Sequence, residues 1–131
     1  MVPGATRPTG GEATGDERFG LETRRHAGTV VLALRGELDH DTAEPLREAL
    51  SRHVEAGAER VLVDCSGLGF CDSTGLNVLL HARLSAQELG GRIELAGLRP
   101  PVARMFDITG ARAVFRVYDG VDEALTDRPR T

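Results

Sequence analysis

Residues 61–76 constrain the fold of this chain more than any other stretch. They begin with the continuous apolar run Val61-Leu62-Val63, which is typical of a strand covered on both faces. A glycine-containing segment follows, and Asp72-Ser73-Thr74 then opens a run with helical periodicity. A strand, a loop and a helix in this order leave one hydroxyl, that of Ser73, at a helix N-terminus, where unpaired backbone N–H groups favour an anion.

The same alternation of strand and helix patterns extends along the rest of the chain. A turn at 26–28 predicts a hairpin between the first two strands, and a polar loop is predicted at 35–41. Strands are predicted at 19–23, 29–34, 61–63, 93–95 and 114–117, and helices starting near residues 41, 72, 100 and 121. Helices between strands imply crossover connections, so the predicted fold is α/β, with a mixed, largely parallel sheet of about five strands and about four helices.

The first two predicted helices carry recognisable end signals. Asp41 or Thr42 is the expected N-cap of the first helix, and Glu44 follows Asp41 by three residues, as in a capping box. Gly57 is expected to end that helix. The second helix carries an apolar stripe with its centre at Leu80, which is predicted to be buried against the sheet; the stripe consists of Leu76, Leu79, Leu80 and Leu84.

Composition indicates a single domain between two tails. The chain has 131 residues, enough for one domain with an ordinary hydrophobic core. Residues 1–17 are rich in Gly, Thr, Pro and Ala and are predicted to form a disordered N-terminal tail. Residues 18–125 are predicted to form the folded domain, and residues 126–131 a flexible C-terminal tail.

Charge and apolar content argue against several classes of partner. The net charge of −4 disfavours nucleic acid, because phosphate binding needs a clustered basic surface. No run approaches the ~20 apolar residues of a membrane span, and no secretory signal is apparent, so a cytoplasmic protein without a membrane partner is expected. The only cysteines are Cys65 and Cys71. They lack the Cys-x-x-Cys spacing of a metal site and are expected to be reduced, and we predict neither a metal nor a cofactor.

Ser73 admits three chemical interpretations. A serine hydrolase is disfavoured, because the glycine that precedes the nucleophile by two positions in such enzymes is absent: Cys71 stands there. No histidine has a spacing that marks it as the base. Serine is also a preferred helix cap, and it is a modifiable hydroxyl. The residues alone leave capping and modification open, and the two are compatible if Asp72 caps the helix.

Three motifs together resemble one protein family. The motifs are Gly36-Glu37-Leu38-Asp39, Val63-Asp64-Cys65-Ser66-Gly67-Leu68 and Asp72-Ser73-Thr74-Gly75-Leu76. From about Phe19 to Leu125 the chain resembles an anti-sigma factor antagonist of the STAS-domain family. The resemblance implies a bacterial partner-switching protein without enzymatic activity. Ser73 is then phosphorylated by an anti-sigma factor that is itself an ATP-dependent serine kinase. The unphosphorylated form binds that kinase and frees the sigma factor, and a PP2C-type phosphatase resets the switch.

The resemblance also suggests which residues meet the partner. Asp72 is expected to cap the helix and, with Thr74 and Gly75, to shape the docking surface. Asp39 is expected beside that surface. Asn77 occupies a position that is often glycine in the family, and it is expected to tune which kinase is recognised.

Two other functions remain alternatives on the sequence alone. The chain resembles STAS domains in general, so it is also similar to a stressosome scaffold or to the soluble component of a lipid transporter. In those cases Ser73 would act in interaction without being phosphorylated. The third possibility is an enzyme built on Ser73.

Overall fold

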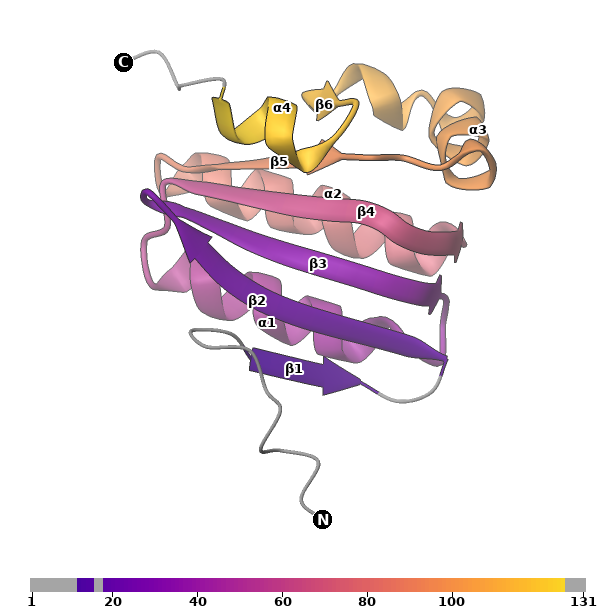
Figure 1. Cartoon of the computed structure of the whole chain (residues 1–131), viewed down its shortest axis with the longest axis horizontal. Helices are drawn as coiled ribbons and strands as arrows, with labels where there is room; N and C mark the ends of the chain where they lie inside the picture. The colour runs from indigo at the N-terminus through magenta and orange to yellow at the C-terminus, as the bar shows by residue number, and fades with distance from the viewer. Residues whose placement is uncertain (1–11, 16–17, 127–131) are drawn as a thin grey trace.

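The fold is a six-stranded sheet with helices on both faces (Figure 1). The computed structural model describes residues 12–15 and 18–126. The strands follow one another across the sheet in chain order, from β1 to β6. They are β1 (Glu12–Gly15), β2 (Phe19–His26), β3 (Thr29–Leu38), β4 (Arg60–Cys71), β5 (Arg92–Ala96) and β6 (Val117–Tyr118).

Antiparallel pairing at one side of the sheet changes to parallel pairing at the other. β1, β2 and β3 pair antiparallel, while β3, β4, β5 and β6 pair parallel. Each parallel pair is joined by a crossover connection. The helices are α1 (Ala43–Glu55), α2 (Ser73–Glu88), α3 (Pro100–Thr109) and α4 (Val121–Thr126), with a 3₁₀ turn at Ala111–Ala113. The predicted α/β class and mixed sheet are confirmed.

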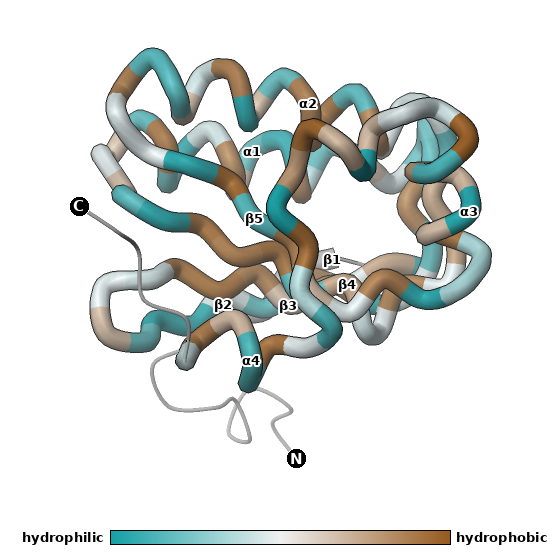
Figure 2. Tube along the Cα trace, turned by 90° about the horizontal axis from the view of Figure 1, so that it is seen from above, coloured by the Kyte–Doolittle hydropathy of each residue, from teal (hydrophilic) through white to brown (hydrophobic). Residues whose placement is uncertain are grey.

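The main core lies between the sheet and the helix pair α1 and α2. Figure 2 shows these two helices on one side of the sheet and α4 on the other. Leu32 of β3, Leu46 of α1 and Leu95 of β5 are fully buried in the main core. A smaller cluster of Val31, Leu62, Ala96 and Ala124 lies on the α4 side. β3 and β4 are therefore covered on both faces, as the apolar run at 61–63 predicted.

β4 is longer than its apolar run, and the predicted glycine loop after residue 63 is wrong. The strand continues to Cys71 and stays paired with β3 as far as Leu38, with register shifts on the way. A side chain at Gly67 would place its Cβ 2.6 Å from the Leu34 carbonyl oxygen. Glycine here permits the close approach of two strands at an irregular register, which local sequence cannot distinguish from a loop.

The N-terminal prediction is also wrong for Glu12–Gly15. This segment forms β1, which pairs with β2 from Glu12↔Thr23 to Gly15↔Gly20. Main-chain hydrogen bonds to the edge of β2 need no apolar side chains, so composition does not reveal such a strand. The remainder of the predicted tails, residues 1–11, 16–17 and 127–131, lies outside the described residues.

The strand predicted at 114–117 is reduced to the two residues of β6. The 3₁₀ turn at Ala111–Ala113 precedes it, and Val114 is 43% exposed. Phe115 is buried, and its ring centroid lies 6.1 Å from that of Phe106 on α3. These apolar residues therefore anchor a turn to α3 instead of extending the sheet.

The buried face of α2 differs from the predicted stripe. Leu76 and Leu79 are buried as predicted, but Leu80 is only half-buried and Leu84 is 54% exposed. Val78 and Ala86 are buried in their place. The reason is that α2 packs against α1 as well as against β4 and β5, so its covered face is turned toward α1.

The orientation of α2 predicts that truncating two of its leucines to alanine will lower the free energy of unfolding by different amounts. Leu79→Ala should lower the free energy of unfolding by about 2–5 kcal/mol, because it opens a cavity in the core. Leu84→Ala, at an exposed position of the same helix, should change it by less than about 0.5 kcal/mol. Urea unfolding followed by circular dichroism measures both, and equal costs would contradict the orientation of α2.

Candidate functional site

β3 and β4 end side by side at one edge of the sheet (Figure 1), and the predicted site residues Asp39 and Asp72 follow directly after them. Leu38 and Cys71, the last residues of these parallel strands, are in register. The loop that begins at Asp39 and the turn that begins at Asp72 therefore start side by side. In open α/β sheets this edge, at the carboxyl ends of the strands, is where ligands and partners are usually bound.

Asp72 joins the two segments. It is the N-cap of α2, and its Oδ1 accepts a hydrogen bond from the Gly75 N–H at 3.1 Å. Its Oδ2 accepts a second bond from the His40 N–H at 3.2 Å. The main-chain N–H of Asp72 donates to the Leu38 carbonyl oxygen at 3.0 Å. The predicted cap is confirmed, and the same side chain also holds the loop after β3.

Ser73 is the first residue of α2, and its side chain is exposed. The helix cap is provided by Asp72, so capping, one of the two roles that the sequence left open for Ser73, is taken by its neighbour. Thr74 follows in the first turn and is half-buried. An exposed hydroxyl in the first turn of a helix lies where the helix dipole and the orphan N–H groups favour added negative charge.

Gly75 is buried beneath this surface. A Cβ at this position would lie 2.6 Å from Leu38 Cγ and 3.0 Å from Cys71 Sγ. The missing side chain therefore lets the first turn of α2 rest on the ends of β3 and β4. Gly75 therefore contributes to the shape of this edge through packing.

Asp39 closes a tight turn on itself. Its Oδ1 accepts the N–H groups of Asp41 at 2.9 Å and Thr42 at 3.1 Å, and its Oδ2 lies 3.4 Å from Arg18 Nη1. Desolvation acts to raise the pKa of Asp39, but the hydrogen bonds from Asp41 and Thr42 and the charge of Arg18 outweigh it and lower the pKa. Asp39 is therefore ionised at neutral pH and held in place by its own turn.

The predicted capping box of α1 does not form as expected. Thr42 is the N-cap residue, but the structure assigns it no side-chain cap hydrogen bond. Its hydroxyl is used within the preceding loop, where it contacts Asp39 and Glu37. Glu44 pairs instead with Arg47, one turn along the helix. Thr42 is a residue of the site that sequence reasoning missed, because a threonine before a helix signals only a cap.

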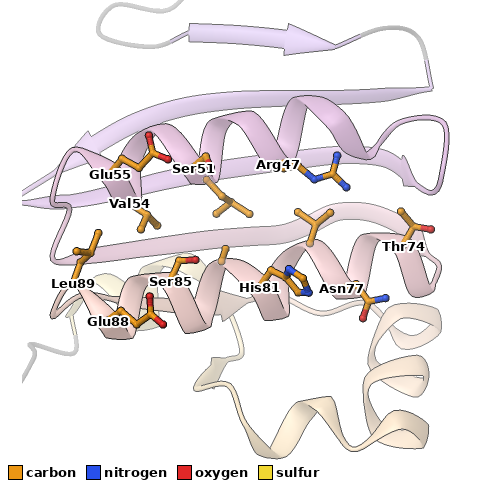
Figure 3. A pocket seen from close by; sticks show the side chains of 13 residues that line it. Arg47, Ser51, Val54, Glu55, Thr74, Asn77, His81, Ser85, Glu88 and Leu89 are labelled. Atoms are coloured by element: carbon orange, nitrogen blue, oxygen red, sulfur yellow. The ribbon is translucent and has the colours of Figure 1, made fainter.

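Thr74 and Asn77 line a groove between α1 and α2 (Figure 3). The groove has a volume of about 670 Å³ and continues from the Ser73 turn along both helices. Asn77 is exposed on its wall. The other lining residues are Arg47, Leu50, Ser51, Val54 and Glu55 from α1, Val78, His81, Ala82, Ser85 and Glu88 from α2, and Leu89, the C-cap of α2.

Neither cysteine has the properties of a reactive thiol. Both side chains are buried, and the two cysteines do not form a disulfide. Burial and the charge of Asp72 raise the pKa of the Cys71 thiol to about 12. Burial also raises the pKa of Cys65 far above its usual range, with the charges of Cys71 and Asp64 adding to the effect. Both thiols are therefore protonated at neutral pH and act as small apolar side chains.

Residues 12–15 and 18–126 contain no group of three His, Cys, Asp or Glu side chains arranged to hold a metal ion. Over the same residues, no helix combines the length and apolar character required to cross a bilayer.

The sequence matches a known domain family. A family model described as "Mlab, STAS domain" covers residues 21–116, which include β3, β4, α2 and the whole Asp39–Ser73 edge. The chain belongs to the STAS domain family. The resemblance inferred from the three motifs is thereby confirmed.

Several proteins similar to this STAS domain are described as anti-sigma factor antagonists. The anti-sigma F factor antagonist of Paenibacillus polymyxa is 31% identical over 108 residues, which are 82% of this chain and 92% of that protein. An anti-sigma factor antagonist from Mycobacterium paratuberculosis has a TM-score of 0.77 at 25% identity, covering 86% of this chain and 97% of that chain. The Bacillus cell fate determinant SpoIIAA, solved in its phosphorylated form, has a TM-score of 0.66 at 26% identity, covering 81% and 96%.

The close packing at Gly75 predicts that a side chain at this position will destabilise this STAS domain. Gly75→Ala should cost about 1–3 kcal/mol, because the added methyl group overpacks the contact with Leu38 and Cys71. Gly120→Ala is the matched control, since a Cβ at Gly120 has no atom within 4 Å. Urea unfolding of the two variants tests this. A Gly75→Ala variant as stable as the control would show that α2 does not rest on these strands.

Proposed function

We propose that this chain is an anti-sigma factor antagonist whose switch is phosphorylation of Ser73. The observation that carries the proposal is that two different residues provide the cap and the exposed hydroxyl at the start of α2. Asp72 caps the helix, and the Ser73 side chain is left exposed beside it. The names of the relatives support it, among them a protein solved in a phosphorylated form.

In this function the partner is an anti-sigma factor with serine kinase activity. The unphosphorylated chain binds the kinase, and the sigma factor is released. Asp39, Asp72 and Thr74 surround Ser73 on the proposed docking surface, and Asn77 extends that surface into the groove between α1 and α2. The chain itself acts as a binding partner and kinase substrate in the cytoplasm, without being an enzyme. A PP2C-type phosphatase removes the phosphate and restores binding.

Phosphorylation changes the charge of the docking surface and leaves the core untouched. It adds about −1.5 to −2 charges and strong acceptor oxygens at Ser73. Within the chain the helix N-terminus favours that charge by roughly 0.3–1 kcal/mol. In the complex the bulky dianion replaces a small hydroxyl at a packed surface, where it must be desolvated or paired. The penalty therefore falls on binding, not on folding.

A second candidate is a STAS interaction module in which Ser73 is never phosphorylated, such as a stressosome scaffold or a lipid-transporter component. The observation in its favour is that the matching family model is described as "Mlab, STAS domain" and not as an antagonist. ATP-dependent incorporation of phosphate at Ser73 separates the two functions.

We predict that phosphorylation weakens binding to the cognate anti-sigma factor several-hundred-fold, which corresponds to about 3–4 kcal/mol. Ser73→Asp should weaken it partly, because it carries less charge in a different shape. Ser73→Ala should bind but accept no phosphate. Titration calorimetry of these forms measures the affinities, and circular dichroism controls for folding.

Ser66→Ala is the matched control for the phosphotransfer reaction. Ser66 is an exposed serine on β4, and its variant should be phosphorylated at the wild-type rate. Equal affinity of the phosphorylated and unmodified forms for the anti-sigma factor would refute the switch, as would unfolding of the chain on phosphorylation.

A further inference from the structure

The hydroxyl of Thr42 is buried and faces away from the helix that Thr42 begins. The residue is 3% exposed and is the N-cap of α1, but it makes no side-chain cap bond to that helix. Its Oγ1 accepts the Asp39 N–H at 2.8 Å and donates to the Glu37 carbonyl oxygen at 2.8 Å. A side chain that usually caps a helix is used here to hold the preceding loop.

The loop from Asp39 to Thr42 has an acceptor for each of its main-chain N–H groups. Three of these N–H groups are bonded inside the loop: Thr42 Oγ1 accepts from Asp39, and Asp39 Oδ1 accepts from Asp41 and from Thr42. The fourth donor, the His40 N–H, is directed out of the loop to Asp72 Oδ2 at 3.2 Å. Closure of the loop by the Thr42 hydroxyl thus aims this N–H at the start of α2.

Asp72 passes this constraint to the neighbouring serine. Its other oxygen holds the Gly75 N–H, so the carboxylate is fixed between the loop and the first turn of α2. Ser73 lies in that turn, one residue after Asp72. Two hydrogen bonds, from His40 to Asp72 and from Gly75 to Asp72, therefore connect the loop to the turn that holds Ser73.

We propose that Thr42 is a positioning residue for Ser73. Its hydroxyl closes the loop after β3, and the loop fixes the Asp72 carboxylate and with it the orientation of the Ser73 hydroxyl toward an incoming phosphoryl group. The proposal rests on the function proposed above, in which Ser73 is the phosphoacceptor. Phosphoryl transfer needs the acceptor oxygen held in line with the phosphate, and small displacements of reacting groups slow such steps steeply.

The test compares Thr42→Val, which keeps the shape and removes the hydroxyl, with Thr42→Ser, which keeps the hydroxyl. With the cognate anti-sigma kinase, kcat/KM for phosphorylation should fall by about tenfold or more in Thr42→Val, mainly through kcat. It should stay within about twofold of wild type in Thr42→Ser. Thr29→Val is the matched control, because Thr29 is also a buried threonine but lies at the far end of β3; its rate should be unchanged.

A second measurement is independent of the kinase. Hydrogen exchange of the His40 and Gly75 amides should be faster in Thr42→Val than in wild type or Thr42→Ser. The rates are compared under conditions in which the three proteins have the same free energy of unfolding. If Thr42→Val fails to fold, Thr42→Ala replaces it, since it cannot overpack the site. Wild-type rates and unchanged exchange in the valine variant overturn the proposal. A wild-type chain that no anti-sigma kinase phosphorylates refutes the proposed function and the catalytic part of this proposal, while the exchange data still decide whether Thr42 fixes Asp72.

Discussion

The carboxylate of Asp72 is the interaction on which the functional edge of this domain depends. One oxygen caps α2 through Gly75, and the other accepts an N–H group of His40, from a segment 32 residues earlier in the chain. A carboxylate can do both because its two oxygens offer several acceptor sites. The start of α2 and the loop after β3 are therefore joined into one hydrogen-bonded unit instead of two independent turns.

The core below this unit sets where its parts lie. Leu38 is fully buried at the end of β3, in register with Cys71 at the end of β4, and both lie against Gly75. Because the two strands are parallel and end in register, the loops that follow them start side by side. The missing side chain at Gly75 lets the first turn of α2 pack directly on the strand ends. The surface that presents Ser73 is built from the interior outward, by backbone pairing and close packing.

The sequence predicts those parts of the molecule that local pattern determines. The order of strands and helices, the hairpin and the Asp72 cap follow from periodicity and cap chemistry within a few residues. What could not be predicted depends on neighbours distant in the chain: β1 forms because β2 offers an edge, β4 extends because Gly67 admits β3, and Leu84 is exposed because α1 covers another side of α2. The hydrogen bonds of the Thr42 hydroxyl could not be predicted either, because they depend on how the loop after β3 folds back on itself.

The division between Asp72 and Ser73 explains how such a surface can change charge without a change of fold. The Gly75 N–H is already occupied by Asp72, so a phosphoryl group on Ser73 would be left to the other orphan N–H groups of the first turn or to solvent. The hydrogen bonds of its own turn and the charge of Arg18 lower the pKa of Asp39, so this carboxylate is ionised in the unmodified chain. In the proposed switch the carboxylates of Asp39 and Asp72 hold the two loops in place, and a phosphate on Ser73 would project outward, where a partner would meet it first.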